Sequence, residues 1–301
     1  MQVKTIRKVL DKKLNDWVNS ISSIELQQLI KRDTIVTGGS IVSLLMGEKV
    51  NDYDIYFKTQ ETALAVAEYY VAEFAKKNPS YTETTVRISE LKNLRGEIEK
   101  VVDIYIPSIG VVASDDAPEP TGELDVVAED GATDEVVDTG DKYRVMFMSS
   151  NAITLSHSIQ LITRFTGDAE QVHKNFDFVH AQCWYEWKED KLFTPEKALL
   201  SMMSKTLKYT GSLYPLASLF RLKKFLQRGW RVSAGEMLKI AFQIKDIDFN
   251  DPLVLRQQLV GVDLAYFYML IQAIEAFKAQ NPEAPLTSSY VVELIDRIFG
   301  G

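Results

Sequence analysis

Apolar side chains recur at helical spacing through the first thirty residues. Three- to four-residue steps predict an amphipathic helix, and the positions that keep them are Ile6, Val9, Leu10, Leu14, Trp17 and Val18. Ser22 and Ser23 supply a cap for a second helix that continues through Ile30. The pattern therefore predicts N-terminal helices over residues 1–32.

A region of mixed helices and strands is expected next. Short apolar or alternating runs predict strands, and Gly, Asn and Pro mark their ends. Apolar residues three or four positions apart predict the helices between them. The expected strands are 34–37, 52–57, 81–88, 100–106, 143–148, 158–165 and 176–185, and the expected helices are 41–46, 60–77 and 168–175.

From residue 195 onward only helices are expected, at 195–208, 214–228, 233–244, 251–280 and 287–299. The fold class is therefore α+β, with a mixed β-sheet domain and flanking helices, followed by an all-helical C-terminal domain. The expected limits are 1–32 for the N-terminal helices, 33–190 for the mixed domain and 191–301 for the helical domain. A functional site is expected between the last two domains.

Composition excludes several classes of protein. Hydrophobic residues make up 46% of the 301 residues, which is enough for a sizeable core. No apolar run reaches the length of about 18 residues that a membrane span needs, and the N-terminus lacks the apolar core of a signal peptide. Cys183 is the single cysteine, so internal disulfides are excluded and a reducing, cytoplasmic location is expected.

The net charge of −8 comes from one segment of the chain. Residues 113–141 hold eleven acidic side chains and no Lys or Arg, whereas the remaining residues hold 34 basic and 31 acidic side chains. Few large apolar groups and strong self-repulsion predict a flexible or loosely hairpin-like insertion, which is a linker, a shield for a basic site or a partner-binding segment. The acidic balance therefore does not argue against an anionic partner.

Gly38-Gly39-Ser40 is the first motif that carries chemistry, and it lies between an expected strand and an expected helix. Two glycines let the backbone approach a phosphate closely, and the amide groups at a helix N-terminus favour anions. Ser40 can cap the helix and donate its hydroxyl to a phosphate. The structural alternative is a tight strand–helix turn without a ligand.

Asp52-x-Asp54 is the second motif, on the next expected strand. Residues i and i+2 of a strand project from one face, so the two carboxylates are expected to lie close together. Mg²⁺ held by carboxylates and substrate phosphates is the usual cation of such a pair. A third acid within an apolar strand would complete a two-metal site, and both Asp103 and Asp177 fit that pattern.

The order of these motifs resembles the signature of the polymerase-beta-type nucleotidyltransferase superfamily, with eleven residues between Ser40 and Asp52. Segments 159–165, 176–178 and 221–230 are similar to a viral or phage-like branch of that superfamily, related to poly(A)- and CCA-adding-type enzymes. The resemblance covers residues 30–232, so the mixed domain resembles a nucleotidyltransferase catalytic domain.

The resemblance implies a metal-dependent transfer of a nucleoside monophosphate from an NTP to an acceptor hydroxyl, with release of pyrophosphate. Asp52 and Asp54 would hold two Mg²⁺ ions, for which Mn²⁺ could substitute. A third acid would bind the metal that activates the acceptor. Asp177 is favoured because it follows the 159–165 strand as the branch pattern requires, and Asp103 is the alternative. Gly38, Gly39 and Ser40 would bind the nucleotide.

Basic residues are concentrated between positions 204 and 239, a segment that contains eight Lys and Arg residues and one acidic residue. One hypothesis assigns Lys205, Lys208 and Tyr209 to the triphosphate and base, because the two lysines are i, i+3 on an expected helix. It assigns Arg221, Lys224 and Arg228, at i, i+3 and i+7, to the acceptor or its phosphates. The alternative is a solvated helix face.

Other catalytic motifs are missing from the sequence. His157, His173 and His180 are expected in a turn, a helix and a strand, so structural roles are favoured for them. The sequence has no Gly-x-Ser-x-Gly elbow and no phosphate-binding loop of the Gly-x-x-x-x-Gly-Lys type.

Two classes of function stay open at this point. The leading hypothesis is a template-independent nucleotidyltransferase that binds an NTP and an RNA 3′ end, with protein or small-molecule hydroxyls and signalling oligonucleotides as alternative acceptors. The second is a non-catalytic nucleotide- or partner-binding protein that retains the fold. No membrane partner is expected, a viral protein of this type would act in the host cytoplasm, and the oligomeric state is left open.

Overall fold

The computed structural model describes residues 2–78, 83–92, 98–106, 111–113, 142–248, 254, 258, 273–274, 276–281 and 287–299. These residues divide into two compact units, the first ending at Thr210 and the second beginning at Gly211. Residues 114–141 of the acidic segment and most of the expected helix 251–280 lie outside the described residues. The assignment of catalytic and accessory roles to the parts of the chain stays a prediction.

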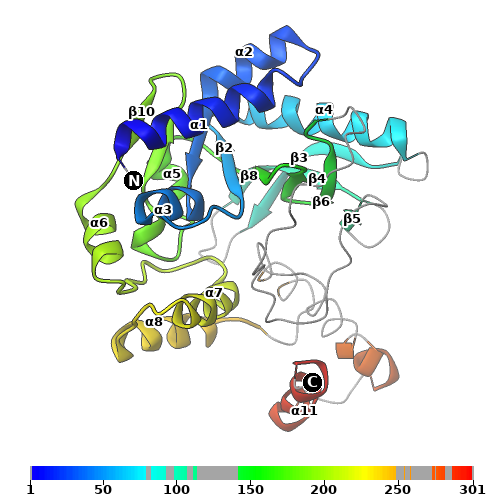
Figure 1. The fold of residues 1–301 in the computed structure, drawn as a ribbon. Coiled ribbons are helices and arrows are strands. Elements are labelled where there is room, and N and C mark those ends of the chain that lie inside the picture. Colours follow the sequence, from blue (N-terminus) through cyan, green and yellow to red (C-terminus); the bar gives the residue numbers. More distant parts are fainter. Residues whose placement is uncertain are drawn as a thin grey trace. The chain divides into compact units, whose positions relative to one another are not determined.

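Two helices open unit 1, as the apolar spacing predicts: α1 (Val3–Val18) and α2 (Ile24–Asp33). Ile6, Leu10, Leu14 and Trp17 form the buried stripe of α1. The hydroxyl of Ser23 accepts a hydrogen bond from the amide of Leu26 at 3.2 Å, which confirms the predicted cap. α2 lies beside α4 (Gln60–Lys77), the predicted long helix (Figure 1).

An eight-stranded mixed sheet forms the centre of unit 1, in the order β10-β9-β1-β2-β8-β7-β6-β5. β1 and β2 pair antiparallel, whereas β2 and β8 pair in parallel. The strands are β1 (Thr34–Thr37), β2 (Tyr53–Phe57), β5 (Val111–Ala113), β6 (Val145–Ser149), β7 (Ala152–Leu155), β8 (Ile159–Thr166), β9 (Trp184–Glu186) and β10 (Lys191–Phe193). A separate antiparallel pair is formed by β3 (Thr85–Lys92) and β4 (Ile98–Tyr105).

Helices cover the sheet and connect its strands. α3 (Gly39–Met46) follows β1, α5 (Ala169–His173) follows β8, and α6 (Glu196–Met203) follows β10. Ile35 and Tyr56, which are paired across β1 and β2, pack on Val172 of α5. Val36 and Ile55 point to the opposite face and are fully buried. Both faces of the central strands therefore carry core residues.

The described elements of unit 2 are all helices: α7 (Pro215–Gln227), α8 (Ala234–Ile244) and α11 (Ser288–Phe299). A mixed sheet with flanking helices in unit 1 and helices in unit 2 confirms the predicted α+β class. Among the described helices, none combines the length and the apolar character that a membrane span requires.

Two element predictions were wrong. Residues 176–185 do not form one strand, because the amide of Val179 bonds to the carbonyl of Lys208 and the chain then turns through a 3₁₀ helix (Val179–Ala181) before β9. The expected helix 195–208 ends at Met203, because Lys205 adopts a left-handed φ of 46° that a continuing helix does not allow. The short strands β5, β7 and β10 were not expected.

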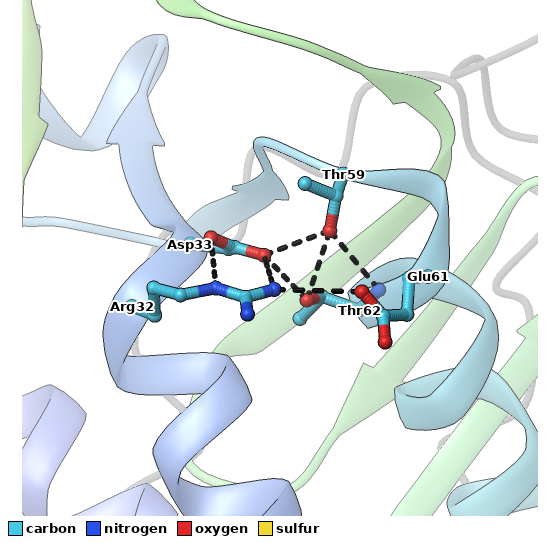
Figure 2. Close-up of polar contacts among 5 residues, drawn as sticks. All are labelled: Arg32, Asp33, Thr59, Glu61 and Thr62. Atoms are coloured by element: carbon cyan, nitrogen blue, oxygen red, sulfur yellow. Dashed lines mark hydrogen bonds and ion pairs between the residues drawn. The ribbon is translucent and has the colours of Figure 1, made fainter.

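A buried carboxylate joins α2, β1 and α4 (Figure 2). Asp33 is 4% exposed and accepts hydrogen bonds from both Nε and Nη2 of Arg32, at 2.9 and 2.8 Å. The hydroxyls of Thr59 and Thr62 donate to the same carboxylate at 2.7 and 2.6 Å. Burial raises the pKa of Asp33, but these donors outweigh burial and hold its pKa at about 2.

This network makes the stability of unit 1 depend on pH. The pKa of Asp33 is lower in the folded chain than in the unfolded one, so its contribution is complete above the unfolded value and is lost as the pH falls toward 2. Replacing Asp33 by Asn should lower the free energy of unfolding at pH 7 by about 2 kcal/mol. Urea unfolding at pH 7, 4 and 3 should show the difference from the wild type shrinking with acid.

Glu68→Gln, at an exposed position of α4, is the matched control and should change stability little at any of these pH values. If Asp33→Asn destabilises the chain equally at pH 7 and pH 3, the charge of this carboxylate is not what joins the three elements.

Candidate functional site

Gly38 forms the turn from β1 into α3, at a place where the backbone has little room. Its φ of 88° and ψ of −146° belong to a region that only glycine occupies without strain. A Cβ atom at this position would lie 3.2 Å from Oδ2 of Asp54 and 3.9 Å from the ring of Phe176. The structure therefore brings the first predicted motif directly against the second.

Ser40 lies in the first turn of α3 and is 1% exposed. Its hydroxyl has no hydrogen-bond partner among the residues that the structure describes. A buried hydroxyl without a partner costs about 1–3 kcal/mol, which a ligand oxygen would recover. The first amides of α3 also have no intrahelical acceptor, because a helix leaves its N-terminal amide groups unpaired. This end of α3 is suited to an anion.

Asp54 lies on β2, as predicted, and Asp52 directly precedes the first residue of this strand. The amide of Tyr53, between them, donates to the carbonyl of Ser158 at 2.9 Å and ties this end of β2 to the start of β8. Asp54 is half-buried and Asp52 is exposed, yet partial desolvation raises the pKa of Asp52. Two carboxylates so close in sequence, one of them beside the turn at the N-terminus of α3, are the type of ligand that a Mg²⁺ ion bound to nucleotide phosphates requires.

The two candidate third acids lie on different elements. Asp103 is on β4, in the separate two-stranded sheet, where its Oδ2 accepts from Nε of Arg87 at 3.1 Å and from Oγ of Ser89 at 3.4 Å. Asp177 is buried in the segment between α5 and β9, and its carbonyl accepts from the amide of Thr210 at 2.9 Å. In the described ranges, no group of three His, Cys, Asp or Glu side chains has a metal-binding arrangement.

The lysines and the tyrosine assigned to the nucleotide do not share a helix face, because α6 ends before them. Nζ of Lys205 lies 4.0 Å from Oε1 of Glu48, just past the C-terminal end of α3. Tyr209 is buried against Phe178, with ring centroids 5.7 Å apart, and Lys208 is exposed.

The acceptor-binding candidates belong to unit 2. Arg221 and Lys224 lie on α7, and Arg228 is the residue that ends this helix. The guanidinium group of Arg228 lies over the ring of Phe225, with 5.8 Å to the ring centroid. The helical spacing predicted for these three residues is therefore present, and their role in binding an acceptor stays a prediction.

His173 and Thr37 form a contact beside the Gly38 turn that the sequence did not indicate. Oγ1 of Thr37 donates its hydrogen to the carbonyl of Cys183 at 2.8 Å. Because that hydrogen is used, the second contact of Oγ1, with Nε2 of His173 at 2.8 Å, is a hydrogen bond only if Nε2 carries a hydrogen and donates it. Burial lowers the pKa of His173 to about 4, which agrees with a neutral ring. This ring lines an open cavity of about 480 Å³, together with Gln182 and Trp184.

Comparison with known proteins identifies relatives of the chain. A family model described as "Gabija anti-defense 2 family protein" matches residues 8–205. The protein Gabija anti-defense 2 of Bacillus phage SPbetaL7 is 21% identical over 241 residues, which cover 79% of this chain and 44% of that protein. The chain therefore spans less than half the length of this curated relative.

Solved structures with a remote likeness are those of CCA-adding enzymes. The Thermotoga maritima enzyme complexed with tRNA has a TM-score of 0.35 and 12% identity, and the match covers 94% of this chain and 59% of that one. A CCA-adding enzyme with CTP has a TM-score of 0.39 and 15% identity, with 96% and 59% covered. The Bacillus stearothermophilus enzyme with CTP has a TM-score of 0.34 and 13% identity, with 86% and 51% covered.

The two glycines of the turn should respond differently to alanine. Gly38→Ala should cost about 1–3 kcal/mol of unfolding free energy, because alanine is strained at this φ and its Cβ would press on Asp54. Gly39→Ala is the matched control: Gly39 is exposed and helical, and a Cβ there would meet no atom within 4 Å. Urea unfolding of the two variants measures the difference, and equal stability would contradict the described turn.

Proposed function

The chain belongs to the Gabija anti-defense 2 family, and from this premise we propose that it counters the Gabija defence as a metal-dependent nucleotidyltransferase. Its substrate is an NTP, from which a nucleoside monophosphate passes to an acceptor hydroxyl. The observation that carries this proposal is the contact between the Gly38 turn and the Asp54 carboxylate. The N-terminus of α3, which suits an anion, lies there beside the Asp54 carboxylate, and this combination supports a site for a triphosphate with its cation.

Each part of the site has a task in this reaction. The hydroxyl of Ser40 and the first amides of α3 bind the triphosphate, and Gly39 leaves the backbone open for it. Asp52 and Asp54 hold Mg²⁺, which neutralises the phosphate charge and polarises the phosphorus when it is bound. The acceptor oxygen forms a bond to the α-phosphorus while the bond from this phosphorus to pyrophosphate breaks, and the proton of the acceptor hydroxyl passes to solvent.

An RNA 3′ end is the proposed acceptor. Arg221 and Lys224 on α7, with Arg228 at its end, give the helical unit a positive surface that suits a polyanion. A hydroxyl group of a protein is the alternative acceptor. The molecule that accepts the nucleotide would be the one that the reaction modifies, so its identity determines how the reaction would counter the Gabija defence. The host cytoplasm is the proposed place of action, which the phage origin of a relative supports.

One observation favours a second function, nucleotide binding without transfer. Among the described residues, no third acid joins Asp52 and Asp54 in a metal-binding group. A chain of this kind would capture a nucleotide or a partner and release no pyrophosphate. Transfer yields pyrophosphate and a labelled acceptor, whereas capture yields neither. Measuring both products for the wild type and for site variants therefore distinguishes the two functions.

Transfer should be visible with NTPs labelled at the α-phosphate, Mg²⁺, and total RNA or total protein as acceptor. The wild type should label an acceptor and release pyrophosphate, and Asp54→Asn should lower the rate by at least about a hundredfold, because the carboxylate stabilises charge in the transition state. Asp246→Asn, at an exposed position after α8, is the matched control. Equal labelling by Asp54→Asn and the wild type would contradict the catalytic proposal.

Gly39→Ala separates ligand binding from folding. Its melting temperature without ligand should equal that of the wild type, because no atom of the chain occupies the space of the new methyl group. Wild-type protein with Mg²⁺ and NTP at about a hundred times the Kd should gain about 2.7 kcal/mol of stability, and the variant should gain less. If the wild type gains nothing with any NTP, both functions that require a nucleotide fail.

A further inference from the structure

The register of the central strands identifies the neighbours of Asp54. β2 and β8 run in parallel, and their paired residues are Tyr53 with Ile159, Asp54 with Gln160, and Ile55 with Leu161. Paired residues of adjacent strands project from the same face, and adjacent strands lie about 4.8 Å apart. Gln160 is therefore the side chain that stands beside Asp54 on the β8 side.

The amide of Gln160 is available to a ligand. The residue is half-buried, and within the described part of the chain its side chain makes no hydrogen bond. Its neighbours along β8, Ile159 and Leu161, are fully buried on the opposite face. A polar side chain between two buried apolar residues, with no hydrogen bond within the described residues, is therefore placed on the face that carries Asp54.

On the other side of Asp54, the β1 register places Thr37 opposite it. β1 is the neighbour there, and its last residue, Thr37, donates its hydroxyl to the carbonyl of Cys183 and accepts from His173. Asp103 is paired with Arg87 on another sheet. The residue that pairs with Asp54 on β8 is an uncharged amide, at a place where a carboxylate could complete a two-metal site.

We propose that Gln160 is the third ligand-binding side chain of the Asp52/Asp54 site, where it contacts the Mg²⁺–triphosphate group from the β8 strand. This inference rests on the proposed function and specifies how its site is built. The amide nitrogen donates a hydrogen bond to a phosphate oxygen. Because an amide brings no charge, the protein holds one Mg²⁺ together with the nucleotide and binds a second ion only weakly.

Binding of Mn²⁺, measured by the electron paramagnetic resonance signal of the free ion, tests this arrangement without turnover. The full chain is titrated in the presence of each of the four α,β-methylene NTPs, which cannot transfer their nucleotide. One tight Mn²⁺ per bound nucleotide is expected for the wild type. Gln160→Ala should weaken nucleotide binding about tenfold or more, because it removes a hydrogen bond to a charged group.

Gln160→Glu should add a second Mn²⁺ site, because it supplies the third carboxylate next to Asp54. Thr154→Ala is the matched control: Thr154 pairs with Gln160 from β7, one strand farther from Asp54, and the variant should behave as the wild type. Melting temperatures of all variants without ligand show that each is folded.

The outcomes separate this inference from the proposed function. If the wild type binds Mn²⁺ and nucleotide through Asp54, but Gln160→Ala matches it and Gln160→Glu gains no second ion, the role of Gln160 is wrong and the proposed function stands. Two tight Mn²⁺ ions on the wild type would also overturn the role of Gln160. If the wild type binds no nucleotide, the proposed function fails and this inference fails with it.

Discussion

The close approach of the Asp54 carboxylate to the backbone of Gly38 is the contact on which the site depends. It requires a residue without a Cβ, at a φ that other residues avoid, and it lies where the last residue of β1 gives way to the first turn of α3. The antiparallel register between β1 and β2 determines which residue of β2 lies next to this turn, and that residue is Asp54. The same pairing places the N-terminus of α3, at Gly38, beside the carboxylate.

The other end of β1 is held by electrostatics. The Asp33 carboxylate, bound by Arg32, Thr59 and Thr62, joins the end of α2, the start of β1 and the first turn of α4 (Figure 2). α4 follows β2 after a short turn, so this network also fixes where β2 ends. The strand pair that carries the candidate site is therefore anchored at one end by the buried carboxylate of Asp33.

Local patterns predicted most of the fold. The amphipathic spacing of α1, the Ser23 cap and the short strands β1 and β2 depend on neighbours in sequence, and the structure confirms them. The segment 176–185 was misassigned because its shape depends on a distant segment: Val179 bonds to Lys208, and Phe178 bridges to Tyr209. The pairing of Gln160 with Asp54 could not be predicted, because it arises from a parallel register between strands about a hundred residues apart.

A crystal structure of the chain with Mn²⁺ and a non-hydrolysable NTP would show where the nucleotide binds. Triphosphate density is expected at the N-terminus of α3, within hydrogen-bond distance of Ser40, and an anomalous Mn²⁺ signal is expected between the phosphates and the carboxylates of Asp52 and Asp54. Nucleotide bound at any other place, with the turn at Gly38 and Gly39 unoccupied at saturating ligand, would contradict the proposed site.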